Sequence, residues 1–80
     1  MSMPDPFDRI TIEKGKMAGK PCIRGMRITV RRVVELVGEY RNWDELIRDY
    51  PDLEPEDLRQ ALNFALAHLD GTIDVYLDAA

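Results

Sequence analysis

GKPCIRGMRIT, residues 19–29, ends where a helical pattern of apolar residues begins. Two glycines enclose a short β-like run, and glycine is favoured where the backbone needs positive φ or a close approach. Pro21 fixes its own φ and removes one hydrogen-bond donor. The stretch carries the cations Lys20, Arg24 and Arg27 and contains no carboxylate and no set of metal ligands. This pattern indicates a turn-rich element that binds a partner rather than catalysing a reaction.

Three short strands are expected: one before residues 19–29, and two within that stretch, on either side of a turn at Gly25. Residues 9–13 alternate apolar and polar side chains, which is typical of a strand. Residues 22–24 and 27–29 are expected to form two further strands around Gly25. Three short strands need a covered face, which the helices or a second copy of the chain would provide.

Three helices are expected after the strands. Thr29 is a suitable N-cap for the first, Asn42 opens the second, and Pro55 is a favourable first residue for the third. Pro51 ends the second helix, and Gly71 is expected to end the third. The expected apolar stripes are Val30, Val33, Val34, Val37 and Tyr40 in the first helix, Trp43, Leu46, Ile47 and Tyr50 in the second, and Leu58, Ala61, Leu62, Ala65, Leu66 and Leu69 in the third.

The predicted fold is therefore mainly α with a small N-terminal β-ribbon, arranged as a three-helix, homeodomain-like helix-turn-helix bundle. Residues 1–8 are expected to form a flexible N-terminal arm, because they contain two prolines and no periodicity. Residues 9–71 are expected to form a single domain of ribbon and helices, and residues 72–80 a C-terminal tail. A domain this small is marginally stable alone, so a homodimer formed through the strands is expected.

Composition excludes several classes of protein. The chain has 80 residues, one cysteine and no run of apolar residues long enough for a signal peptide or a membrane span. A cytoplasmic protein with no membrane association is expected, and Cys22 is predicted to be a buried structural thiol. One cysteine and one histidine, His68, give no recurring metal-ligand spacing, and no nucleophile motif is present. No enzymatic activity, no cofactor, no metal and no small-molecule substrate are expected.

Charge is distributed unevenly along the chain. Residues 1–41 contain nine Lys/Arg and five Asp/Glu, a net charge of +4, whereas residues 42–80 carry a net charge of −8. This polarity predicts two surfaces with different partners, although two solvated faces would give the same pattern.

Two surfaces are candidates for binding DNA. The third helix is expected to expose Glu56, Asp57, Arg59, Gln60 and Asn63 near its start, and three of these can read bases. The carboxylates at that end oppose phosphate, so the basic strands and first helix are the alternative. Arg27 or Lys20 could instead cap a turn carbonyl or pair with a carboxylate. The candidate DNA-binding residues are Lys20, Arg24, Arg27, Arg31, Arg32, Arg59, Gln60 and Asn63.

Two sets of residues carry a resemblance to a known family. Gly19, Lys20, Pro21, Ile23, Gly25, Arg27 and Ile28 form the first set, and Leu46, Ile47, Tyr50, Pro51, Leu53, Asp57 and Ala61 form the second. On these residues the chain resembles the small bacterial domain-of-unknown-function family 433, whose members look antitoxin-like and are often encoded beside a PIN-like ribonuclease toxin.

The resemblance implies the antitoxin of a type II toxin–antitoxin pair, which neutralises a PIN-like ribonuclease toxin and binds its own operator DNA as a homodimer. The acidic, apolar tail would then face the cationic RNA-binding surface of the toxin. The expected toxin contacts are Ile73, Asp74, Val75 and Leu77. The alternative is a stand-alone helix-turn-helix transcription regulator, or a protein-interaction module, without a toxin.

Overall fold

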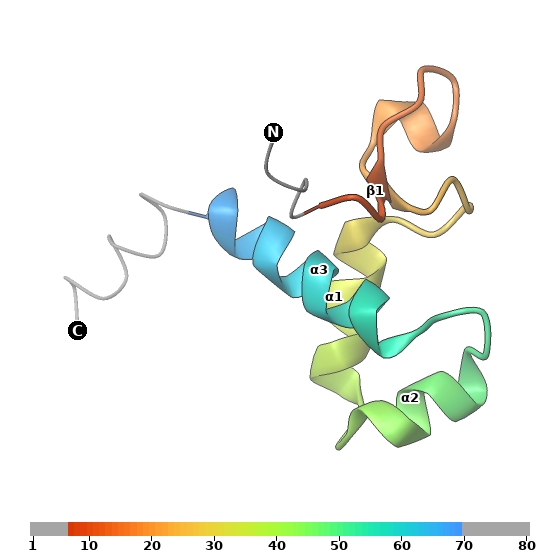
Figure 1. Cartoon of the computed structure of the whole chain (residues 1–80), viewed down its shortest axis with the longest axis vertical. Helices are drawn as coiled ribbons and strands as arrows, with labels where there is room; N and C mark the ends of the chain where they lie inside the picture. The colour runs from red at the N-terminus through yellow and green to blue at the C-terminus, as the bar shows by residue number, and fades with distance from the viewer. Residues whose placement is uncertain (1–6, 70–80) are drawn as a thin grey trace, which may run out of the picture.

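Three helices follow a small ribbon in the structure, a computed structural model that describes residues 7–69 (Figure 1). In chain order the elements are β1 (Ile10–Thr11), the 3₁₀ turn η1 (Met17–Gly19), β2 (Cys22–Ile23), α1 (Val30–Glu39), α2 (Trp43–Asp49) and α3 (Pro55–Ala67). The predicted class, mainly α with a small N-terminal β-ribbon, is confirmed. The tail predicted over 72–80 and the cap predicted at Gly71 lie outside the described residues.

Local capping signals set the helix starts. The Thr29 hydroxyl accepts a hydrogen bond of 3.0 Å from the Arg32 N–H, and the Asn42 side chain accepts one of 2.9 Å from the Glu45 N–H. Pro55 is the first residue of α3. All three predicted helix starts are confirmed, because each depends on a side chain within one turn. Within residues 7–69, no helix has the length and apolar character that crossing a membrane would require.

The ribbon is smaller than predicted. β1 pairs antiparallel with β2, with Ile10 opposite Ile23 and Thr11 opposite Cys22, and an isolated bridge joins Cys22 to Thr29. The strand expected over residues 9–13 is two residues long, and the one expected over 27–29 is reduced to that bridge. Alternation continues past β1, but Ile12 is 63% exposed, so no packing extends the pairing.

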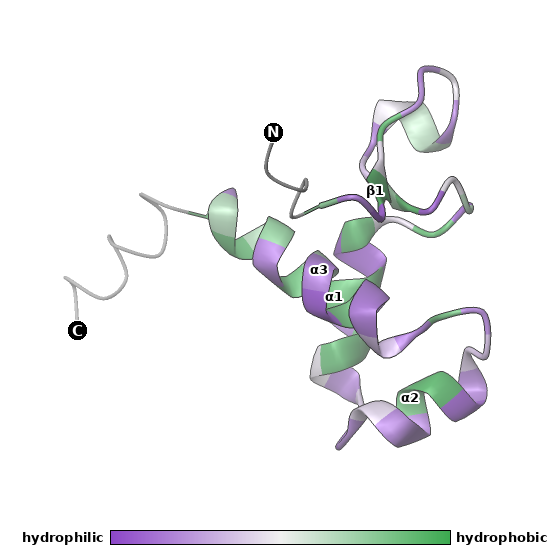
Figure 2. Ribbon diagram, in the orientation of Figure 1, coloured by the Kyte–Doolittle hydropathy of each residue, from purple (hydrophilic) through white to green (hydrophobic). Residues whose placement is uncertain are grey.

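The hydrophobic core lies where β2 and the three helices meet. Its buried members are Ile23, Val30, Val33, Leu36, Leu46, Leu53, Leu58 and Ala61. α1 packs against both α2 and α3, and α3 crosses α1 in Figure 1. Figure 2 shows hydrophobic and hydrophilic residues alternating along α1 and α2, as the apolar stripes predicted.

One face of α1 differs from the prediction. Leu36 is only 1% exposed although it lies off the expected stripe, whereas Val34 and Val37 are half-buried. Burial follows the residues spaced by three from Val30 through Val33 to Leu36. The difference arises because α2 and α3 cover that side of α1, which the periodicity of α1 alone does not specify.

The expected stripe of α3 is buried only in its first half. Leu58 and Ala61 are fully buried, whereas Leu66 is 62% exposed and Leu69, beyond the end of the helix at Ala67, is 40% exposed. In Figure 2 the last turns of α3 are coloured largely as hydrophobic. The apolar surface at this end of α3 therefore remains open in the described chain.

Candidate functional site

A tight turn in the hairpin after β2 directs Arg24 toward α3. Arg24 and Gly25 take φ values of 46° and 71°, and the Met26 N–H donates to the Ile23 carbonyl at 2.8 Å. Positive φ at both central residues is the geometry of a type I′ turn. The Gly25 N–H donates to the Thr11 hydroxyl at 2.9 Å, which holds the turn against β1.

Arg24 forms a bidentate ion pair with Asp57 of α3. Its Nε lies 3.0 Å from Oδ1 and its Nη2 lies 2.8 Å from Oδ2, while Nη2 also donates to the Asp52 carbonyl at 2.6 Å. Arg9 donates to the same carboxylate at 3.1 Å and to Glu54 at 2.5 Å. Arg24, Arg9, Glu54 and Asp57 form what we call the ribbon–α3 lock.

Asp57 is at the centre of this lock and is fully buried. Burial alone would raise the pKa of Asp57, but hydrogen bonds from Arg24, from the Glu54 N–H and from Arg9 outweigh it, so the pKa lies below its ordinary value. The carboxylate is therefore held ionised, and its hydrogen bonds join α3 to the ribbon. The expectation that Asp57 is exposed at the start of α3 was wrong, because the ribbon covers it.

The lock also brings together charges from the two halves of the chain. Arg9 and Arg24 belong to the basic first half, and they pair with Glu54 and Asp57 of the acidic second half. Within residues 7–69, charges from the two halves of the chain therefore meet at this lock, while the prediction of two surfaces with different partners stays a prediction.

Gln60, predicted to read a base, is 4% exposed. Its Oε1 accepts from the Arg9 N–H at 2.9 Å, and its Nε2 donates to Asp8 and to Glu56, each at 2.8 Å. Its hydrogen-bonding groups are used inside the protein, so the prediction that Gln60 is exposed was wrong. Asp8 belongs to the arm predicted over residues 1–8, and it is held against α3 by this contact.

The other two residues of α3 that were predicted to read bases are Arg59 and Asn63, and within the described chain only the Arg59 side chain is paired. Arg59 donates through Nε to Glu56 at 2.8 Å and makes a second hydrogen bond to it through Nη2. The hydrogen bonds from Arg59 and Gln60 lower the pKa of Glu56 to about 2. Asn63 is exposed, and its side chain has no hydrogen-bond partner within residues 7–69. The start of α3 thus presents an arginine that is already paired with a carboxylate.

Three predicted cations remain available on the hairpin and the first turn of α1. Lys20 and Arg27 are exposed, and neither forms an ion pair within the described part of the chain. The Arg31 side chain is 86% exposed and approaches Glu35 only to 3.6 Å. Arg32 is more engaged, because its guanidinium lies 3.4 Å from Glu35 and 3.8 Å from Glu39. Lys20, Arg27 and Arg31 form what we call the hairpin cation set.

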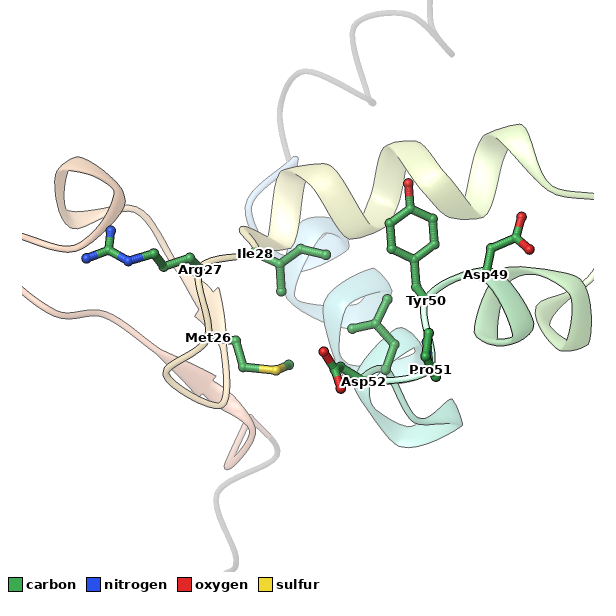
Figure 3. Close-up of a pocket in the computed structure, with 8 residues that line it drawn as sticks. Met26, Arg27, Ile28, Asp49, Tyr50, Pro51 and Asp52 are labelled. Carbon is green, nitrogen blue, oxygen red and sulfur yellow. The ribbon is translucent and has the colours of Figure 1, made fainter.

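A pocket of about 320 Å³ lies beside Arg27, between the hairpin loop and the connection from α2 to α3 (Figure 3). Met26 and Ile28 point across it toward Tyr50 and Asp52, while the Arg27 side chain points away. The lining comes from Met26 to Ile28 and from Asp49 to Leu53. The two stretches that carried the resemblance, one around Gly25 and one around Tyr50, therefore meet at this pocket.

A metal site needs several side-chain ligands that converge on one point. Within residues 7–69 there is no group of three or more His, Cys, Asp or Glu side chains that could hold a metal ion. Cys22 is 2% exposed, as predicted for a structural thiol, and its Sγ donates to the Lys20 carbonyl at 3.3 Å.

The fold and these surfaces define a small, mainly helical domain with an N-terminal ribbon that is locked onto its third helix. A family model described as "Protein of unknown function (DUF433)" matches residues 10–65, which is more than half of the chain. The chain belongs to this family, as the resemblance had indicated. No curated protein and no solved structure was found to match the chain.

Proposed function

We propose that this protein is a cytoplasmic antitoxin of a type II toxin–antitoxin pair, which neutralises a PIN-like ribonuclease toxin and binds its own operator DNA as a homodimer. The resemblance to antitoxin-like members of the family supports the proposal. The observation that carries its DNA-binding half is the hairpin cation set, since Lys20, Arg27 and Arg31 are exposed and weakly paired.

The proposed DNA-binding surface is the hairpin with the first turn of α1, not α3. Phosphate contacts supply most of the non-specific affinity for DNA, and they require cations that are not already neutralised. On α3, Arg59 is paired with Glu56 and Gln60 is buried. Arg24 is excluded as well, because its guanidinium is held by Asp57. A hairpin is able to enter a major groove, so the ribbon is a sufficient scaffold.

Fluorescence anisotropy with DNA from upstream of the gene tests this surface. We expect Arg27→Glu and the double variant Lys20→Glu/Arg31→Glu to weaken binding. Each should also lower the slope of log K against log salt by about 1 for every phosphate that the variant no longer neutralises. Arg59→Glu is the matched control on α3 and should change affinity far less. An Arg59→Glu effect equal to that of the hairpin variants would contradict the assignment.

The toxin-binding half of the proposal concerns Ile73, Asp74, Val75 and Leu77, which lie outside the described residues. Co-expression with the product of the neighbouring gene tests it through growth rescue and co-purification. We expect Ile73→Asp/Leu77→Asp to abolish rescue, because apolar anchors dominate such contacts. Unchanged rescue would exclude these residues as toxin contacts.

The second candidate is a stand-alone transcription regulator without a toxin. The exposed hairpin cation set favours it equally, because DNA binding alone would use the same residues. A small PIN-like reading frame beside the gene supports the antitoxin, whereas an isolated gene whose product still binds its upstream DNA supports the regulator.

A further inference from the structure

The first turns of α1 and the last turns of α3 leave an apolar groove of about 590 Å³ between them. Its apolar lining includes Val30 and Val34 from α1, and Phe64, Ala65 and Leu69 from the α3 end. Leu69 is 40% exposed, and Phe64 and Val34 are half-buried. Contiguous apolar surface that stays open in a small domain marks an interaction site. We call this feature the α1–α3 groove.

The rim of the α1–α3 groove is predominantly cationic. Lys20 and Arg31 both line it, and among the lining residues within 7–69 the one carboxylate is Glu35. Glu35 is also approached by Arg32, at 3.4 Å, so its charge is shared between two arginines. The positive end of the α1 dipole lies at Val30, on the same side. An occupant of this groove should therefore combine apolar side chains with negative charge.

The sequence directly after Leu69 has this composition. Residues 70–80 read DGTIDVYLDAA, with three aspartates, no lysine or arginine, and the apolar residues Ile73, Val75 and Leu77 at every second position. Leu69 itself lines the groove, so the segment starts beside its own binding site. A short tether of this kind gives an effective concentration in the millimolar range.

We propose that residues 70–80 bind in the α1–α3 groove of their own chain. Ile73 and Leu77 contact the apolar lining, and Asp74 and Asp78 face Lys20 and Arg31. The segment and the phosphates of DNA therefore compete for these two cations, whereas Arg27, which does not line the groove, stays available to DNA. The inference goes beyond the proposed function and needs no toxin. If the antitoxin proposal also holds, the residues that contact the toxin are covered in the free protein, and the toxin displaces them from the groove.

The test uses the full-length, isotope-labelled protein and NMR. We expect nuclear Overhauser contacts between the Ile73 or Leu77 methyl groups and Val34 or Phe64, unchanged over a tenfold range of protein concentration. Lys20→Glu/Arg31→Glu should move the chemical shifts of residues 73–77 toward random-coil values. Adding Asp74→Lys/Asp78→Lys to that variant should restore them, because the charges are exchanged.

Two controls separate a specific effect at the groove from a general charge effect or a loss of the fold. Arg41→Glu/Arg48→Glu reverses two exposed cations outside the groove and should leave residues 73–77 unaffected. The amide shifts of Val33 and Leu58 report whether each variant keeps its core. Random-coil shifts for residues 73–77 in the unmodified chain would overturn the proposal. Contacts seen only between differently labelled molecules, or an equal effect of the Arg41/Arg48 variant, would also overturn it.

Discussion

At Asp57, burial and hydrogen bonding act on one carboxylate in opposite directions. The side chain is fully buried, and donors from Arg24, Arg9 and the Glu54 backbone compensate for its lost hydration. A buried ion pair contributes little net stability when intact, yet removing one partner leaves an uncompensated charge. Breaking the ribbon–α3 lock should therefore cost more stability than the intact lock contributes.

Asp57→Asn should accordingly lower the free energy of unfolding by about 1–3 kcal/mol, because the charge-assisted hydrogen bonds from Arg24 and Arg9 to a buried carboxylate are lost, while both arginines remain partly exposed to water. Urea unfolding followed by Trp43 fluorescence measures the change. Asp52→Asn is the matched control, since Asp52 contributes its backbone carbonyl to Arg24, and it should shift stability by less than about 0.5 kcal/mol. Equal losses for both variants would contradict the role of the Asp57 carboxylate.

Asp57 also predicts how stability depends on pH. Its folded pKa lies below the unfolded value of about 3.9, so at acidic pH the unfolded chain binds the proton first. The stabilisation is present above about pH 4 and disappears as the pH falls through the folded pKa. NMR titration of the Asp57 carboxyl carbon should give a midpoint below about 3.9, with urea midpoints falling over the same range. A midpoint at or above that value would contradict this expectation.

At the scale of elements, the turn between β2 and α1 positions Arg24 for the ribbon–α3 lock. Glycine has a different role in this turn than in a helix, as Gly25 and Gly38 show. Gly25 has a φ of +71°, and a Cβ added there would lie 3.3 Å from Glu13 Oε2. Gly38 lies within α1, where an added Cβ meets nothing within 4 Å. The same chemical change therefore has opposite consequences in the turn and in the helix.

Gly25→Ala should reduce the free energy of unfolding by about 1–2 kcal/mol, because a Cβ is strained in the left-handed region. Gly38→Ala should raise it by about 0.5–1 kcal/mol, because alanine loses less backbone entropy in a helix. Thermal unfolding of the two variants, each compared with the unmodified chain, measures both. Shifts of the same sign would show that the turn does not constrain residue 25.

At the scale of the whole molecule, the domain is small, and two of the places where residues 7–69 leave apolar side chains exposed are relevant to assembly. One is the α1–α3 groove, and the other is the ribbon edge, where Ile12 is 63% exposed directly after β1. β1 pairs with β2 on one side, so its other side is an edge available to a second copy. The predicted homodimer through the strands would use this edge.

Ile12→Lys should therefore shift the protein toward the monomer, because a lysine at a strand edge opposes pairing with another chain. Light scattering coupled to size-exclusion chromatography, over a range of concentrations, measures the mass. Met17→Lys, at a nearby residue that is 37% exposed in η1, is the matched control and should leave the mass unchanged. A dimer that persists with Ile12→Lys would place the interface elsewhere.

Much of this protein follows from the sequence by itself. Thr29, Asn42 and Pro55 set the helix starts because capping and proline geometry act within one turn. The membership of the family and the burial of Cys22 are likewise predictable, since both depend on local pattern.

The tertiary structure alone decided which polar groups stay available. Arg24 and Asp57 are 33 residues apart and Arg9 and Gln60 are 51 apart, and no local rule pairs residues at such separations. Where the ribbon packs on α3, Arg24 and Gln60 form hydrogen bonds inside the protein. Lys20, Arg27 and Arg31 stay exposed. At the end of α3, Leu66 and Leu69 stay 62% and 40% exposed, because a helix buries only the part of its apolar stripe that a neighbouring element covers.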